Sequence, residues 1–241
     1  MAINWQLVII GGLLFQGWEG AVPQQGSYTL RSLALHLDNT LLGKRRTAVL
    51  ERVTVLGSPD APTTILEFTD LLCQQCRRFD VETFGTLREK LVTRGVVSFI
   101  PVDFVMSAYA EAQQLFALEF CSIESKNFWD IRSLILRLNN PLQVEELRGQ
   151  VSGLHNRNAS CNAFKDARSA LVQRLRASTN FNVTATPTFV IGHLKVDGFH
   201  GIKSMSGFMT YAQMKQFIDE VDSKAGIGIR ADVSSFANEV R

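Results

Sequence analysis

The sequence predicts an α/β fold in which a mixed central sheet, flanked by helices, is interrupted by an all-helical insertion. Two observations carry this prediction. Patterns typical of strand, helix and strand follow one another between residues 63 and 100, and strand patterns return only after residue 187. Between them, residues 108–178 show only the helical spacing of apolar side chains. A chain of 241 residues, 46% of them hydrophobic, is long enough for one large domain with such an insertion.

The first strand–helix–strand unit is the clearest local pattern. The segment Thr63–Phe68 is rich in β-forming residues and predicts a central strand. A helix is expected over Cys73–Val92, closed by Gly95, and a second strand over Val96–Ile100. Because short connections of this kind cross over right-handedly, we expect the two strands to be parallel.

Four helices are expected in the insertion: one marked by Leu115, Leu118, Glu119 and Cys121, one at Phe128–Leu138, a short one at Pro141–Val151 and one at Ser160–Ala177. Strands are then expected at Thr188–Ile191 and Leu194–Val196, joined by a turn at Gly192–His193. A last helix is expected from Ser206 to Asp222.

The region before the first strand is less regular. Apolar residues in Leu30–Leu42 have helical spacing and predict a helix. The expected division of the chain is a leader or anchor (1–25), an N-terminal extension (26–57), the first part of the α/β domain (58–107), the helical insertion (108–178), the second part of the domain (179–228) and a tail (229–241).

The first residues contain an apolar stretch, Leu7–Phe15, that is too short for a comfortable membrane span of ~20 residues. Its length and the small residues near Gly20 and Ala21 fit a secretory signal, but the first basic residue is Arg31. Two interpretations stay open: an export signal or short anchor through residues 1–18, or an ordinary buried N-terminal segment.

Charge and cysteine spacing exclude several functions. The net charge is +2 and the only dense basic cluster is Lys44–Arg46, so we expect no nucleic-acid partner. The four cysteines contain one CxxC, and no two of the four histidines lie three to five residues apart, which argues against a zinc site. We expect neither a cofactor nor a metal.

The motif Cys73-Gln74-Gln75-Cys76 lies where a strand gives way to a helix. Unpaired N–H groups and the helix dipole favour a thiolate at the first sulfur. We therefore expect Cys73 to be the exposed nucleophile and Cys76, one turn further in, to resolve the mixed disulfide. The alternative is an inert structural disulfide. Arg77 and Arg78 follow, and we expect them to lie on a solvated face rather than to act on the thiolate.

Two motifs, Leu66–Cys76 and Thr186–Gly192, lie on either side of the helical insertion. Together they resemble the DsbA-like thiol:disulfide oxidoreductases, which have a thioredoxin fold with an inserted helical domain. The resemblance covers residues ~58–225. It implies exchange of the Cys73–Cys76 disulfide with the thiols or disulfides of protein substrates.

The resemblance also implies roles for three other residues. Glu67, six positions before the first cysteine, would accept or relay the proton of Cys76; the alternative is a strand-end glutamate turned to water. Pro187 would be cis and would set the Thr186 backbone against the dithiol, where a substrate segment could pair with it; the alternative is a trans proline at a strand start. The Thr186 hydroxyl could tune the sulfurs.

Cys121 and Cys161 lie in parts of the insertion where relatives often have a second disulfide, so we expect a structural bridge between them. The alternative is a pair of buried free thiols.

The chain departs from the family between its cysteines. Proline and histidine are usual there, whereas this chain has Gln74 and Gln75, which makes strong oxidant character doubtful. We expect an extracytoplasmic protein, periplasmic or secreted, that supports oxidative folding and exchanges electrons with a membrane redox partner. A reductase or isomerase, favoured by the glutamines and Thr186, and a thiol-dependent copper(I) binder are the alternatives.

Overall fold

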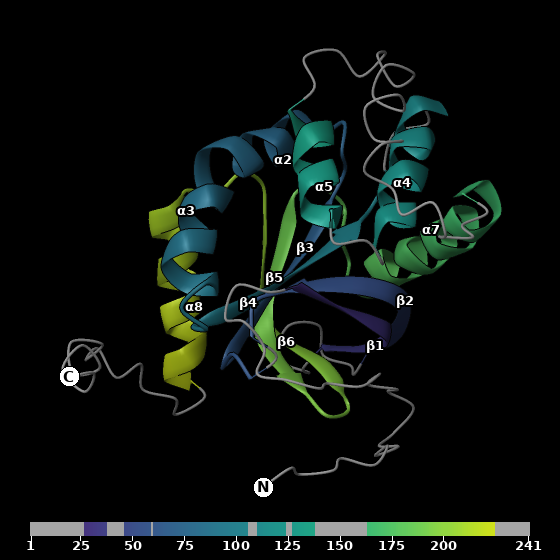
Figure 1. Ribbon diagram of the computed structural model, residues 1–241. Helices are drawn as coiled ribbons and strands as arrows, with labels where there is room; N and C mark the ends of the chain where they lie inside the picture. The colour runs from purple at the N-terminus through teal and green to yellow at the C-terminus, as the bar shows by residue number, and fades with distance from the viewer. Residues whose placement is uncertain are drawn as a thin grey trace, which may run out of the picture.

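The computed structural model describes residues 27–37, 46–58, 60–105, 110–123, 127–137 and 163–224 (Figure 1). The expected leader or anchor (1–25), the short helix 141–151, Cys161 and the tail (229–241) lie outside these residues. Within the described ranges, none of the helices combines the length and the apolar character that crossing a bilayer requires.

In the described residues the sheet contains six strands: β1 (Ser27–Leu37), β2 (Arg46–Leu56), β3 (Thr63–Thr69), β4 (Val97–Asp103), β5 (Thr188–Lys195) and β6 (Gly198–Ser206). Their order is β1-β2-β4-β3-β5-β6, and β1 also pairs with β6, so the ring of strands closes. The pairs β3–β4 and β1–β6 are parallel and the others are antiparallel. The predicted mixed sheet is confirmed; its closure was not expected.

A continuous helical segment from Gln74 to Val92 connects β3 to β4. It contains α2 (Gln74–Phe79), α3 (Gly85–Leu87) and two π-helical stretches, Asp80–Phe84 and Arg88–Val92. Gly95 follows it with a φ of 70°, a conformation that favours glycine. The predicted strand–helix–strand unit with parallel strands is therefore confirmed.

The described part of the insertion contains α4 (Ala110–Ser122), α5 (Phe128–Leu136) and α7 (Ala163–Asn180), and α8 (Tyr211–Lys224) follows the sheet. Figure 1 shows α3 and α8 together on one side of the strands, and α4, α5 and α7 on the other. The three insertion helices correspond to three of the four that the sequence predicts, with α7 shifted by about three residues at each end.

Side-chain alternation along β3 separates two environments. Leu66 and Phe68 pack into a buried cluster with apolar side chains of β1, β2 and β4. Ile65 packs on the other face, against a cluster that includes helical residues such as Phe79 and Phe116. Because side chains two residues apart point the same way, Glu67 lies on the face of Ile65, toward the helices.

The helix predicted over Leu30–Leu42 is wrong, because residues 27–37 form β1. Leu33 and Leu35 are both fully buried and Ala34 between them is only partly buried, so this part of the segment also has the period of two that a strand needs. Tertiary pairing decides between the two periods: β1 pairs with β2 over nearly its whole length and with β6 over three positions.

The turn predicted at Gly192–His193 is also wrong. Both residues lie inside β5, and the turn falls at Val196–Asp197 before β6, a strand that was not predicted. Pairing of β5 with β6 shifts register between Ile191 and Gly192, and a Cβ on Gly192 would lie 1.9 Å from the carbonyl oxygen of His200. Gly192 therefore allows a close approach of two backbones and does not turn the chain.

Candidate active site

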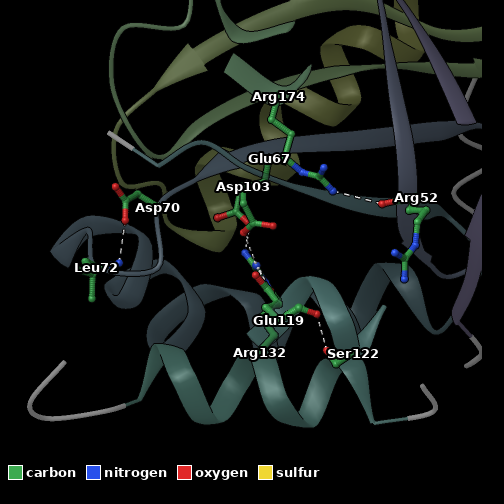
Figure 2. Close-up of polar contacts among 9 residues, drawn as sticks. All are labelled: Arg52, Glu67, Asp70, Leu72, Asp103, Glu119, Ser122, Arg132 and Arg174. Carbon is green, nitrogen blue, oxygen red and sulfur yellow. Dashed lines mark hydrogen bonds and ion pairs between the residues drawn. The ribbon is translucent and has the colours of Figure 1, made fainter. Parts of the chain in front are cut away.

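Cys73 caps the N-terminus of α2 in an extended conformation, with φ −69° and ψ 122°. Its carbonyl oxygen accepts a hydrogen bond from the Arg77 N–H at 3.0 Å, which starts the helix. The preceding loop is held by Asp70, whose Oδ1 accepts from the Leu72 N–H at 2.9 Å and whose carbonyl accepts from the Cys73 N–H at 3.0 Å (Figure 2). The motif thus stands at a helix N-terminus, as predicted.

The Cys73 thiol is half-buried, and its Sγ lies 3.3 Å from the Thr186 carbonyl oxygen, to which it can donate a hydrogen bond. Its pKa is lowered to about 5. The main cause is a hydrogen bond from the Cys76 thiol; the Thr186 side chain and the N–H groups of Cys76 and Gln75 add to it, against partial burial. This value lies between ~8.5 for a free cysteine and ~3.5 for DsbA.

Cys76 has the opposite character. It is 1% exposed, and its pKa is raised far above that of a free thiol. The hydrogen bond to Cys73 is the largest cause, followed by burial and by the negative charge of Glu67. Only Cys73 is therefore open to an outside sulfur, while Cys76 keeps its proton until a base removes it. Both cysteines are free thiols in this structure.

The loop before β5 faces the dithiol through Thr186. The Thr186–Pro187 peptide bond is cis, so the trans alternative is wrong. Pro187 is fixed by the residue that follows β6, since its carbonyl oxygen accepts a hydrogen bond from the Gly207 N–H at 2.7 Å. Thr188 donates to the carbonyl oxygen of Ala185 at 2.7 Å. These bonds hold the loop from both sides of the proline.

Glu67 lies on β3 and is 3% exposed, so the alternative in which it turns to water is wrong. Its Oε2 accepts a hydrogen bond from Nη2 of Arg132 at 3.3 Å (Figure 2). Burial raises the pKa of Glu67 to about 7, although the Arg132 charge works in the other direction. A carboxyl group that titrates near neutral pH can both accept and return a proton.

Thr69 lies two residues after Glu67 on the same face of β3 and is completely buried. Its Oγ1 has no hydrogen-bond partner at normal distance among the described residues. The hydroxyl nevertheless lowers the pKa of both Glu67 and Cys76. It thus acts on the carboxyl group and on the buried sulfur at once.

Sequence reasoning did not identify Arg132, which contacts the Glu67 carboxylate, or Asp103 and Glu119, which contact Arg132. A signal was present: Arg132 follows Phe128 by four residues and precedes Ile135 by three, on the apolar face of α5. A charge on such a face requires a buried partner. The partners come from other elements, so no local pattern could name them.

Arg77 and Arg78 do not share one environment. Arg77 is half-buried and its Nε donates to the Leu136 carbonyl oxygen at 2.9 Å, which ties α2 to the end of α5, so the prediction of a solvated face is wrong for it. Arg78 is exposed, pairs with Glu82 at 2.9 Å and lies 4.0 Å from the centre of the Phe208 ring.

Cys121, near the end of α4, takes part in a disulfide. Cys161 lies outside the described residues. The pairing of Cys121 with Cys161 therefore stays a prediction.

A dithiol with a half-buried outer sulfur of lowered pKa and a buried inner sulfur, set at a helix N-terminus against a cis-proline loop, defines the chain as a thiol–disulfide oxidoreductase. A family model described as thioredoxin matches residues 50–220, and the chain belongs to that family. The chain is also similar to disulfide bond formation protein D of Bacillus subtilis (strain 168). The two are 22% identical over 178 residues, which cover 69% of this chain and 75% of the relative.

Solved structures share the fold. Wolbachia pipientis α-DsbA1 matches with a TM-score of 0.59 and 19% identity over 73% of this chain and 93% of its own. Oxidised BdbD from Bacillus subtilis matches with a TM-score of 0.55 and 22% identity over 69% and 90%. The catalytic domain of Proteus mirabilis ScsC matches with a TM-score of 0.56 and 18% identity over 70% and 88%. The predicted thioredoxin-like fold with a helical insertion is confirmed.

Proposed function

We propose that this protein is a dithiol oxidase that donates its Cys73–Cys76 disulfide to folding proteins outside the cytoplasm. The opposite pKa shifts of the two sulfurs carry the proposal. A stabilised Cys73 thiolate favours the reduced form, and a dithiol that prefers to be reduced has an oxidising disulfide. The name of the Bacillus subtilis relative, disulfide bond formation protein D, agrees with this direction.

The exchange would start with a substrate thiolate that attacks Sγ of Cys73 in the oxidised protein. The Cys73–Cys76 bond breaks, its electron pair goes to Cys76, and Cys76 takes a proton from the protonated Glu67. A second substrate thiolate then attacks the substrate sulfur of the mixed disulfide, which releases the substrate disulfide and the Cys73 thiolate. The roles of Glu67 reverse when the reaction runs backwards.

The substrate segment would lie along the loop that contains Thr186 and Pro187. The Thr186 carbonyl oxygen is 3.3 Å from Sγ of Cys73, so an extended peptide bound to this backbone would bring its cysteine to the attacked sulfur. Main-chain hydrogen bonds of this kind do not depend on side chains and suit many unfolded substrates. We assign reoxidation of the dithiol to a membrane redox partner.

The alternative is a reductase or isomerase on the same scaffold, which the neutral Gln74 and Gln75 favour. The equilibrium constant of the Cys73–Cys76 pair with glutathione separates the two, because an oxidase needs an unstable disulfide. We expect the oxidised protein to form disulfides in a reduced, unfolded model protein faster than the reduced form cleaves those of insulin. Rapid insulin reduction with a disulfide as stable as that of a reductase would contradict the oxidase assignment.

A further inference from the structure

A cluster of buried charges lies beneath the dithiol, around Arg132 of α5. Its Nη1 donates to Oε1 of Glu119 at 2.5 Å and to Oδ1 of Asp103 at 3.3 Å, and its Nη2 donates to Oε2 of Glu67 at 3.3 Å. Figure 2 shows these side chains meeting from β3, β4, α4 and α5. Each of the four side chains is at most 7% exposed, so water does not screen their charges.

The charges of this cluster do not balance if every group is ionised. Three carboxylates around one guanidinium leave a net charge of −2 in the core. Arg174 of α7, 1% exposed, acts on Asp103 and Glu119 from the other side and brings the sum to −1. A buried charge without compensation costs several kcal/mol, which uptake of one proton removes.

Other charged groups near the cluster do not change this balance. Asp80 acts on Glu67, but it faces the Arg137 guanidinium at 3.8 Å. Arg52 is only half-buried and stacks on the Phe120 ring at 4.5 Å; its backbone carbonyl oxygen accepts a hydrogen bond from Arg174 at 3.2 Å (Figure 2). We therefore place the proton on one of the three carboxyl groups of the cluster.

Glu119 is the group that the geometry favours for the proton. Its Oε1 accepts from Arg132, whereas its buried Oε2 has no hydrogen-bond partner among the described residues. An ionised oxygen without a donor is unfavourable in a dry interior, and a proton turns it into a donor. Asp103 is the neighbouring acceptor, since both acids bind the same nitrogen of Arg132. Burial, followed by the charge of Asp103, raises the pKa of Glu119 to about 8.

We propose that Asp103 and Glu119 share one proton and that Arg132 connects this pair to Glu67 as a positioning residue, holding Glu67 in the ionised form that takes the proton of Cys76. The inference rests on the exchange function proposed above. In the step concerned, the Cys76 thiol gives its proton to Glu67, and its electron pair forms the bond to Sγ of Cys73. The substrate sulfur leaves with the electron pair of the broken mixed disulfide.

The shared proton gives this step an alkaline limit. Above the titration of the carboxyl pair, Arg132 faces one more negative charge and its hold on Glu67 weakens. The pKa of Glu67 and that of Cys76 then both rise, because each is sensitive to added negative charge. The helical insertion, through Arg132 and Glu119, thereby sets the proton chemistry of a sulfur that lies on the thioredoxin-like part.

The first test is a ¹³C NMR titration of the side-chain carboxyl groups in the full reduced chain. We expect Glu119 to stay protonated at pH 7 and to titrate near pH 8, and the Glu67 signal to report a second, alkaline step at the same pH. Glu119→Gln keeps a neutral group that can donate to Asp103, so the fold is retained and the second step disappears. Glu82→Gln, at a half-exposed glutamate paired with Arg78, is the matched control and keeps both steps. Titration of Glu119 near its ordinary pKa would overturn the proposal.

The second test measures the pH profile with which Cys76 releases thionitrobenzoate from a mixed disulfide on Cys73. Arg132→Met removes the charge that keeps Glu67 ionised, so we expect the midpoint to move up by at least one pH unit and the rate at pH 7 to fall at least tenfold. Arg132→Lys should restore part of this loss. Arg137→Gln removes a guanidinium that is 66% exposed, and it should shift the midpoint much less.

A folded Arg132→Met protein with an unchanged midpoint would overturn the role of the arginine. If that variant does not fold, the wild-type and Glu119→Gln titrations still decide the proposal. Failure of the proposed function gives a different result: the carboxyl groups titrate as expected and thionitrobenzoate is released, but no disulfide reaches a reduced protein.

Discussion

The two sulfurs of the motif are three residues apart and are held in opposite states by two different regions of the molecule. Cys73 is tuned from the surface, by backbone N–H groups at the start of α2 and by the Thr186 loop. Cys76 is tuned from below, by burial and by Glu67, whose carboxylate is tied to the helical insertion. Nucleophile and leaving group can therefore be adjusted separately, although they share one helical turn.

The most severe test of this contrast exchanges each sulfur for oxygen. Cys73→Ser should reduce disulfide transfer to background, because the remaining thiol is 1% exposed and keeps its proton. Cys76→Ser should keep a reactive thiolate and accumulate mixed disulfides with substrate disulfides, since the motif then has no second thiol to resolve them. Mass spectrometry after reaction with a protein that contains disulfides measures both, because a Cys73 thiolate that attacks a substrate disulfide forms the mixed disulfide and expels the other substrate sulfur as a thiolate. Mixed disulfides on Cys76 in the first variant would contradict the assignment of roles.

The second prediction compares the titration of the two thiols. Only the thiolate is alkylated, so the rate of Cys73 alkylation by iodoacetamide should rise with pH and reach half its maximum at about pH 5. Cys76 should stay unmodified across the range in which the protein is folded. Peptide mapping after short pulses at each pH gives the two curves. A Cys73 midpoint near 8.5 would show that the helix N-terminus and Thr186 do not stabilise the thiolate.

The surroundings of Cys73 could be predicted from sequence, whereas much of the buried region around Cys76 and Glu67 could not. The CxxC, its helix, the parallel strands and the proline loop are local patterns, and each lies where the sequence indicates. Burial of Glu67 follows from its place in an apolar strand. Arg132, Asp103 and Glu119 come from α5, β4 and α4, so their meeting depends on how the insertion packs.

The error over β1 has the same physical origin. Residues 30–42 satisfy a helical spacing, and Leu33, Leu35 and Leu37 also satisfy a strand period, so the local pattern does not decide. Pairing with β2 and β6 decides it. Where two local periods coexist, a partner that lies far away in the sequence determines the structure.

The third prediction concerns the buried region and the stability of the oxidised protein, in which the motif sulfurs do not titrate. Glu67 has a pKa of about 7 in the folded state against 4.5 for the ordinary group, so the folded state binds more protons between these values. Its contribution to the free energy of unfolding is therefore greatest below pH 4.5 and is lost as the pH rises toward 7. Glu67→Gln should flatten this fall, measured by urea unfolding from pH 5 to 8. A slope identical to that of the wild type would show that Glu67 does not ionise in this pH range in the folded protein.

The fourth prediction tests whether Thr69 acts through its hydroxyl group or only through the space that its side chain fills. This hydroxyl lowers the pKa of Glu67 and of Cys76, so Thr69→Val should raise both. A hydrogen-bonding group worth about 1 kcal/mol changes an equilibrium roughly fivefold, and the Cys76 step should slow by a similar factor at neutral pH. Thr69→Ser keeps the hydroxyl and should behave like the wild type. Equal rates in the valine and serine variants would show that the hydroxyl has no part in the proton transfer.

The smallest effect is expected from a substitution at Gln75, beside Cys73. The motif offers Cys73 two neutral amides, and a histidine at position 75 would bring an imidazole that can carry a positive charge beside the thiolate. Gln75→His should therefore lower the Cys73 pKa below about 5 and make the disulfide more oxidising. One pKa unit and ~30 mV both correspond to ~1.4 kcal/mol. The reduction potential should therefore rise by ~30 mV for each unit by which the Cys73 pKa falls. Equilibration with glutathione measures the potential, and thiolate absorbance at 240 nm measures the pKa. Since the buried side is untouched, the pH dependence of mixed-disulfide release by Cys76 should stay as in the wild type. A change in that profile would show that the two regions are not independent.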